Sequence, residues 1–174
     1  KIMEPSDIVY LAQIENSIGR SDKTIDLMMK LADQKPHFDQ NERQLLVLTF
    51  KTAVDPIRET IRVLNMCLAN ETNAERAELV RKETEASINQ LNEICNNGID
   101  LVKNVLFPAC DDAQGTAFFL KLQGDFYRYM VEFATEGELE RIKKEAETAY
   151  KKALNTCKES LSPADPTNLG VILN

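Results

Sequence analysis

Apolar residues recur every three or four positions along almost the whole chain, which is the spacing of side chains on one face of a helix. The first such series is Ile8, Leu11, Ile14 and Ile18. Only six glycines and six prolines interrupt the 174 residues, so the segments between breaks are long enough for helices. The pattern predicts an all-α protein that folds as a single domain.

Turn-forming residues mark where these helices begin and end. Ser6 and Asp7 are expected to cap the first helix, and Asp39 or Asn41 the third. Gly98 lies inside the fourth helix and is expected to interrupt it at a modest cost in stability. We predict about seven helices, over roughly residues 8–18, 23–35, 40–69, 74–107, 111–134, 138–161 and from 167 onward.

Pro56 falls inside the third predicted helix and leaves two possibilities open. Proline removes one backbone hydrogen bond and crowds the carbonyl of Thr52, which predicts a kink between these two residues. Alternatively, Asp55 caps a new helix in which Pro56 is the first residue.

The third predicted helix also carries three cations. Lys51 and Arg58 are two helical turns apart, about 10.5 Å of rise, so they project from the same face. Arg62 adds a third cation one turn later, and the nearby carboxylates are Asp55 and Glu59. Such a stripe is either a solvated helix surface or one wall of an anion-binding site.

The second segment of interest is residues 121–130, which combines aromatic side chains with a cation. On a helix, Arg128 and Tyr129 are 100° apart and can face the same cleft, while Phe126 and Met130 share another stripe. By itself this segment is typical of a core helix with a polar edge. It gains a functional interpretation if Arg128 meets the cations of the third helix.

Composition excludes several classes of function. A net charge of −7 argues against general nucleic-acid binding, and no apolar run approaches the length of about 20 residues that spans a membrane. The lone His37 cannot complete a zinc set, and the sequence has no glycine-rich phosphate loop or nucleophile–base pair. We therefore expect no enzyme activity, no metal and no cofactor. The scattered cysteines are typical of buried thiols in a cytoplasmic protein: Cys67, Cys95, Cys110 and Cys157.

Several blocks of the sequence resemble one known family. Residues 42–51 read ERQLLVLTFK and resemble the third-helix signature RNLLSVAYK of 14-3-3 proteins. Residues 120–129 read LKLQGDFYRY and resemble the family stretch LKMKGDYYRYLAE. Residues 94–96, Tyr150 and residues 166–174 match in the same order and spacing. The resemblance covers roughly residues 39–174 and is weaker over the first two helices.

The resemblance implies an antiparallel array with about seven of the family's nine helices. It implies an adaptor that binds phosphoserine or phosphothreonine peptides of client proteins in signalling. It assigns four residues to the phosphate pocket: Lys51, Arg58, Arg128 and Tyr129. It assigns three residues to the peptide groove: Lys121, Leu173 and Asn174. The alternative is a helical scaffold that binds partners irrespective of phosphorylation.

This chain departs from the family pattern next to the pocket. The family usually has Gly-Ala-Arg-Arg where this chain has Asp55, Pro56, Ile57 and Arg58, so one cation is lost and one carboxylate is gained. Asp55 can reach either Lys51 or Arg58 in the empty pocket. We therefore expect weaker phosphate binding than in a typical member.

The other departures concern assembly and length. In the family, the helices corresponding to residues 1–38 mediate dimerisation and residues 39–174 correspond to the groove. On the fourth helix the usual Tyr, Lys and Glu of the dimer interface are replaced by Glu83, Ala86 and Gln90, so a homodimer with altered contacts is expected. Family members continue for two more helices, so the groove is expected to be incomplete after Asn174.

Overall fold

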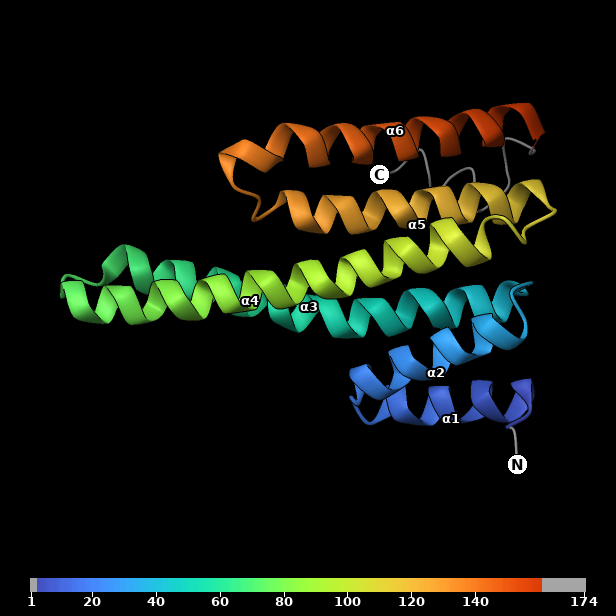
Figure 1. The fold of residues 1–174 in the computed structure, drawn as a ribbon, viewed down its shortest axis with the longest axis horizontal. Coiled ribbons are helices and arrows are strands. Elements are labelled where there is room, and N and C mark those ends of the chain that lie inside the picture. The colour runs from blue at the N-terminus through green and yellow to red at the C-terminus, as the bar shows by residue number, and fades with distance from the viewer. Residues whose placement is uncertain (1–2, 161–174) are drawn as a thin grey trace.

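A computed structural model describes residues 3–160 of the chain, and these form a stack of helices (Figure 1). Over this part of the chain the α-helices are α1 (Pro5–Ser17), α2 (Ser21–Gln34), α3 (Gln40–Asn70), α4 (Ala74–Leu101), α5 (Ala113–Val131) and α6 (Glu136–Ser160). A π-helical turn, η1 (Val102–Leu106), follows α4 directly. The all-α prediction is confirmed. The seventh predicted helix, from residue 167, lies outside the described residues.

The helices lie side by side, with α1 and α2 at one end of the stack and α5 and α6 at the other (Figure 1). The long helices α3 and α4 form the middle layer and extend beyond their neighbours on one side. No helix in residues 3–160 is long and apolar enough to cross a membrane.

The starts of α1, α2 and α6 differ from the sequence prediction, and α2 begins at Ser21 instead of near residue 23. α1 begins at Pro5 with Glu4 as its N-cap, two or three residues before the predicted cap at Ser6 and Asp7, because proline is well suited to the first helical position. α6 begins at Glu136, inside the predicted break at 135–137. There the Thr135 hydroxyl donates to the Glu138 carboxylate at 3.1 Å, and the Thr135 carbonyl accepts from the first turn.

α3 is one continuous helix through Pro56, so the helix does not restart at Asp55. Its N-cap is Asp39, whose side chain accepts from the Glu42 N–H at 2.9 Å. The Glu42 carboxylate in turn accepts from the Asp39 N–H at 2.7 Å, which completes a capping box.

Gly98 has a packing role that its sequence pattern does not reveal. It is buried within α4, and a Cβ atom at this position would lie 2.5 Å from the ring of Phe126. Glycine therefore allows α5 to approach α4 closely. The end of α4 also differs from a regular helix, because residues Val102–Leu106 widen into the π-helical turn.

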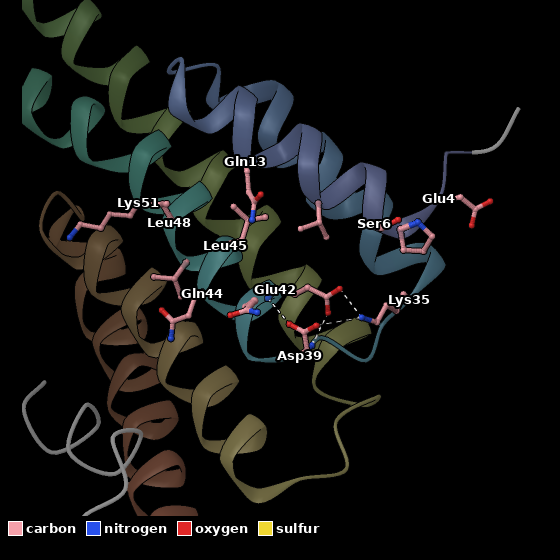
Figure 2. Close-up of a pocket in the computed structure, with 14 residues that line it drawn as sticks. Glu4, Ser6, Gln13, Lys35, Asp39, Glu42, Gln44, Leu45, Leu48 and Lys51 are labelled. Carbon is pink, nitrogen blue, oxygen red and sulfur yellow. Dashed lines mark hydrogen bonds and ion pairs between the residues drawn. The ribbon is translucent and has the colours of Figure 1, made fainter.

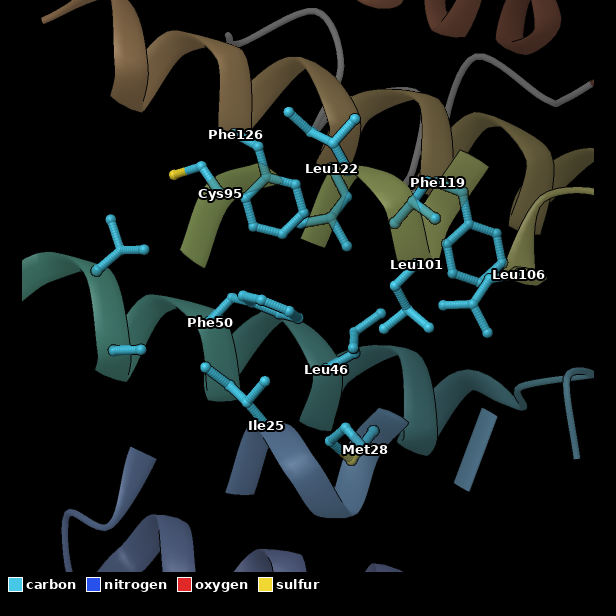
Figure 3. Packing of buried hydrophobic residues seen from close by; sticks show 14 of the residues in the cluster. Ile25, Met28, Leu46, Phe50, Cys95, Leu101, Leu106, Phe119, Leu122 and Phe126 are labelled. Atoms are coloured by element: carbon cyan, nitrogen blue, oxygen red, sulfur yellow. The ribbon is translucent and has the colours of Figure 1, made fainter. Parts of the chain in front are cut away.

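The core lies between α2, α3, α4 and α5 (Figure 3). Phe126 is fully buried, and its ring meets Phe50 of α3 edge to face with 4.9 Å between centroids. Met130 is also buried, so the predicted core stripe of residues 126 and 130 is confirmed. The buried Cys95 thiol has its pKa raised to about 12 by desolvation, whereas Cys67 is exposed and does not follow the expectation of a buried thiol.

Candidate functional site

Three of the four residues assigned to the phosphate pocket lie together between α3 and α5. The Arg58 guanidinium lies over the Tyr129 ring at 4.7 Å from its centroid. The Arg128 guanidinium lies at 4.8 Å from the same centroid. Both cations are therefore placed by one aromatic ring, because a guanidinium is attracted to the negative face of the ring. We call Arg58, Arg128 and Tyr129 the arginine–tyrosine cluster.

The cluster already binds carboxylates of the protein itself. The Nε of Arg58 donates at 2.8 Å to the carboxylate of Glu132, the C-cap of α5, and the Nη2 of Arg58 lies 2.6 Å from the same carboxylate. Its Nη1 reaches Asp55 at 3.2 Å, one turn earlier on α3. The sequence prediction that Asp55 pairs with Lys51 or Arg58 is therefore settled in favour of Arg58. Both edges of the Arg58 guanidinium are thus occupied by carboxylates of the protein, which is the paired geometry that a bound anion would also use.

Glu132 connects Arg58 to Arg62, the third cation of the stripe. Arg62 donates to Glu132 at 2.7 Å, and the side chain of Glu132 is 27% exposed. Burial alone would raise the pKa of Glu132, but hydrogen bonds from both arginines outweigh it and lower the pKa below its usual value. Glu132 stays ionised at neutral pH and holds Arg58 in position.

Sequence reasoning missed Glu132. The available signal is its position one turn after Arg128, on the same face of α5.

Lys51 does not join the arginine–tyrosine cluster through any contact. It is exposed on α3, and within residues 3–160 its ammonium has no hydrogen bond or ion pair. The seven positions that separate it from Arg58 correspond to about 10.5 Å along the helix. Lys51 instead lines a groove between α1 and α3.

Lys121, assigned to the peptide groove, is bound by a buried carboxylate. Its ammonium donates to Asp125 at 2.8 Å, and the Tyr150 hydroxyl of α6 donates to the same carboxylate at 2.6 Å. Arg128 lies 3.8 Å from Asp125, so this carboxylate links both cations of α5. Gly124 makes room for the Tyr150 ring, which a Cβ atom would approach to 2.8 Å. Leu173 and Asn174 lie outside the described residues.

The Tyr129 hydroxyl is available as a hydrogen-bond donor. Burial raises the pKa of Tyr129, and the neighbouring Asp125 carboxylate raises it further, against the opposing effect of Arg128. The phenol therefore stays protonated at neutral pH. Within residues 3–160 no cluster of three or more His, Cys, Asp or Glu side chains is arranged to hold a metal ion. The arrangement suits the binding of an anion with several acceptor oxygens.

Comparison with known proteins identifies the family. The family model for 14-3-3 proteins matches residues 11–174. A 14-3-3 protein of Giardia intestinalis is 30% identical over 173 residues, which cover 97% of this chain and 69% of that protein. The 14-3-3 protein 8 of Solanum lycopersicum is also 30% identical, over 98% of this chain and 67% of its own length.

A further relative is the 14-3-3-like protein GF14 epsilon of Arabidopsis thaliana, with 29% identity over 95% of this chain and 66% of its own length. The match extends from α1 to the last residues of the sequence, and the helical array of the structure agrees with it. The family match supports a role as an adaptor. The chain belongs to the 14-3-3 family.

Proposed function

We propose that this chain is a cytoplasmic adaptor that binds phosphoserine or phosphothreonine peptides of client proteins through the arginine–tyrosine cluster. The observation that carries the proposal is the pair of guanidinium groups, one from α3 and one from α5, on a single tyrosine ring. Each guanidinium group can form charge-assisted hydrogen bonds with an anion that binds beside this ring.

A phosphate group fits the chemistry of the cluster better than a carboxylate does. It carries a charge of about −1.5 to −2 at neutral pH and offers three acceptor oxygens. Arg58 and Arg128 can each donate two hydrogen bonds, and the Tyr129 hydroxyl adds one more. Asp55 occupies one edge of Arg58 and has 43% of its side chain exposed, so a ligand can displace it into solvent.

Lys51 contributes to this site at longer range. Its ammonium has no partner within the described residues, so it adds positive potential without an internal carboxylate to cancel it. The Lys121 ammonium is hydrogen-bonded to Asp125, so it can contact a bound peptide only after this hydrogen bond breaks.

Fluorescence polarisation with one peptide in phosphorylated and unphosphorylated forms tests the proposal. We expect the phosphorylated form to bind at least tenfold more tightly, which corresponds to about 1.4 kcal/mol. Equal affinity for the two forms would instead favour the phosphorylation-independent scaffold, the alternative that the sequence leaves open.

Replacing Asp55 with alanine is expected to strengthen binding of the phosphorylated peptide. The Asp55 carboxylate competes with the ligand for Nη1 of Arg58, and an exposed pair of this kind contributes roughly 0.2–1 kcal/mol, or up to about fivefold in affinity. Isothermal titration with the same peptide measures the change. Glu59→Ala is the matched control, because Glu59 pairs with Arg62 at 3.4 Å and not with the cluster. An unchanged affinity of Asp55→Ala would refute the competition.

We also propose that the protein is a homodimer. α1 exposes the apolar series Tyr10, Ile14 and Ile18 at helical spacing, and Tyr10 is 66% exposed. α3 and α4 expose a second apolar set: Val63, Met66 and Leu79. Two such surfaces on one chain support association of copies, because apolar area left in water is unfavourable. Glu83, Ala86 and Gln90, which replace the family's usual interface residues, are exposed on α4.

Replacing Ile14 with glutamate is therefore expected to shift the protein from dimer to monomer at micromolar concentration. The change places a charge in the centre of the α1 apolar series, where desolvating it opposes association. Sedimentation velocity measures the two species. Phe107→Glu, a partly exposed apolar residue after η1, is the control and should leave the dimer intact. A wild-type protein that sediments only as a monomer would exclude the dimer.

A further inference from the structure

Tyr150 brings α6 into contact with the residues that surround the arginine–tyrosine cluster. Its ring packs against α5 at Gly124, where a Cβ atom would lie 2.8 Å from the ring, so the close approach depends on glycine. From this position the Tyr150 hydroxyl donates to Oδ1 of Asp125 at 2.6 Å. The two helices are therefore joined by a hydrogen bond as well as by apolar packing.

Asp125 is a buried carboxylate that divides its two oxygens between different donors. Only 12% of its side chain is exposed. Lys121 donates to Oδ2 at 2.8 Å, and Tyr150 donates to Oδ1. Nη2 of Arg128 lies 3.8 Å from the same Oδ1, which is too far for a hydrogen bond. The carboxylate thus takes its hydrogen bonds from Lys121 and Tyr150, and the Arg128 guanidinium stays outside this set.

This division leaves the donors of Arg128 available to an anion. Its guanidinium lies on the Tyr129 ring, and its side chain is 44% exposed. Within residues 3–160 no carboxylate lies closer to it than Asp125. Burial alone would lower the pKa of Arg128, but the Tyr150 hydroxyl and the charge of Asp125 outweigh burial and raise it. Arg58, in contrast, has both edges on carboxylates.

The Tyr150 hydroxyl maintains this division, because a buried carboxylate oxygen without a donor is costly and attracts the nearest free donor. Lys121 already pairs with Oδ2. Lys51 lines the groove between α1 and α3, which shares no residue with the network around Asp125 (Figure 2). Arg128 is then the cation within reach of Oδ1. A shift of about 1 Å would bring it to hydrogen-bond distance and turn its guanidinium towards Asp125.

We propose that Tyr150 is a positioning residue of the phosphate site, and that its hydroxyl, by occupying Oδ1 of Asp125, keeps the Arg128 guanidinium available to the phosphate. The inference rests on the proposed function, because it concerns the same anion site. It adds α6 to the elements that determine phosphate affinity, and it makes Asp125 an internal competitor for Arg128.

A double-mutant cycle between Tyr150 and Asp125 tests the proposal, by fluorescence polarisation with one peptide in phosphorylated and unphosphorylated forms. Tyr150→Phe keeps the ring against Gly124 and removes the hydroxyl. We expect it to weaken binding of the phosphorylated peptide roughly tenfold, the scale of one hydrogen bond to a charged group. Asp125→Asn removes the competing charge and should bind this peptide more tightly than the wild type. In the Asp125→Asn background, Tyr150→Phe should change the affinity by less than about twofold.

Tyr127→Phe is the matched control and should bind like the wild type. Tyr127 is a buried tyrosine of α5 whose hydroxyl makes no hydrogen bond within residues 3–160. Urea unfolding verifies that each variant is folded.

Three results would overturn the positioning role and leave the proposed function standing. One is an unchanged affinity of Tyr150→Phe for the phosphorylated peptide. Another is an equal loss from Tyr150→Phe in both backgrounds, which would show that the hydroxyl only supports the fold. The third is weaker binding by Asp125→Asn, which would show that Asp125 does not compete for Arg128. A wild-type protein without preference for the phosphorylated peptide overturns the proposed function and this inference together.

Discussion

Replacing Arg58 with alanine is expected to remove most of the affinity that depends on phosphorylation. Arg58 is the residue of the cluster that comes from α3, and its guanidinium lies on the Tyr129 ring while both of its edges face acceptors. Hydrogen bonds to a charged group contribute about 1.5–3 kcal/mol, so we expect the phosphorylated peptide to bind roughly 10- to 150-fold more weakly. Fluorescence polarisation with the phosphorylated and unphosphorylated peptides measures this difference directly.

The variant should remain folded, because removing Arg58 leaves no buried charge unpaired. Glu132 keeps Arg62 as a partner at 2.5 Å, and Asp55 is partly exposed to solvent. The affinity of Arg58→Lys for the phosphorylated peptide should lie between those of the wild type and Arg58→Ala, since lysine keeps the charge but loses the paired hydrogen bonds. Arg81→Ala removes an exposed arginine of α4 that pairs with Glu78, and serves as the control. If Arg58→Ala keeps the full preference for phosphate while remaining folded, the cluster is not the phosphate site.

The spacing of cations along α3 and their partners on the same helix could be predicted from the sequence, but the partner at the end of α5 could not. Periodicity places Lys51 and Arg58 on one face, and Asp55 is within reach of Arg58 on the same helix, as observed. Glu132 joins Arg58 from 74 positions away along the chain. Which helix packs against which, and in what register, depends on tertiary contacts that no local pattern encodes.

The separation of Lys51 from the cluster has the same origin. Residues seven positions apart share a face, yet they are two turns apart and meet different neighbours. Arg58 lies beside α5, where it contacts the Tyr129 ring and pairs with Glu132. Lys51 instead lines the groove between α1 and α3. The spacing of residues on one helix predicts the direction in which their side chains point. Only the packing of several helices determines which side chains come into contact.

The errors at helix ends have local physical causes. α6 starts inside a predicted break, because the backbone carbonyl of Thr135 accepts from the N–H groups of Glu138 and Leu139 and the Thr135 hydroxyl bonds the Glu138 carboxylate. The sequence predicts that Gly98 interrupts the fourth helix. In the structure α4 continues through Gly98, whose missing side chain leaves room for the Phe126 ring. The π-helical turn after α4 left no sequence signal that distinguishes it from a regular helix. Glycine and threonine each have several structural uses, and the sequence alone does not say which applies.

Replacing Phe126 with alanine is expected to destabilise the fold by about 3–5 kcal/mol. The side chain is fully buried, with Phe50 of α3 against its edge and Gly98 of α4 against its tip. The three helices around it are long and held by many other contacts, so they cannot collapse into the vacated volume. Urea unfolding followed by circular dichroism measures the free energy of unfolding. Phe107→Ala, at a residue that is 39% exposed, should cost less than about 1 kcal/mol.

The same contact can be tested from its opposite side with Gly98→Ala. Helix propensity alone favours alanine over glycine by about 1 kcal/mol, which would make this variant more stable. The close approach of Phe126 predicts the reverse, because the new Cβ atom would lie 2.5 Å from a buried ring that has no free space to move into. The double variant Gly98→Ala/Phe126→Leu should therefore lose less free energy of unfolding than the two single variants lose in sum. Additive costs, or a stabilising Gly98→Ala, would show that α5 does not depend on this contact for its position, and Arg128 and Tyr129 would then need another explanation for theirs.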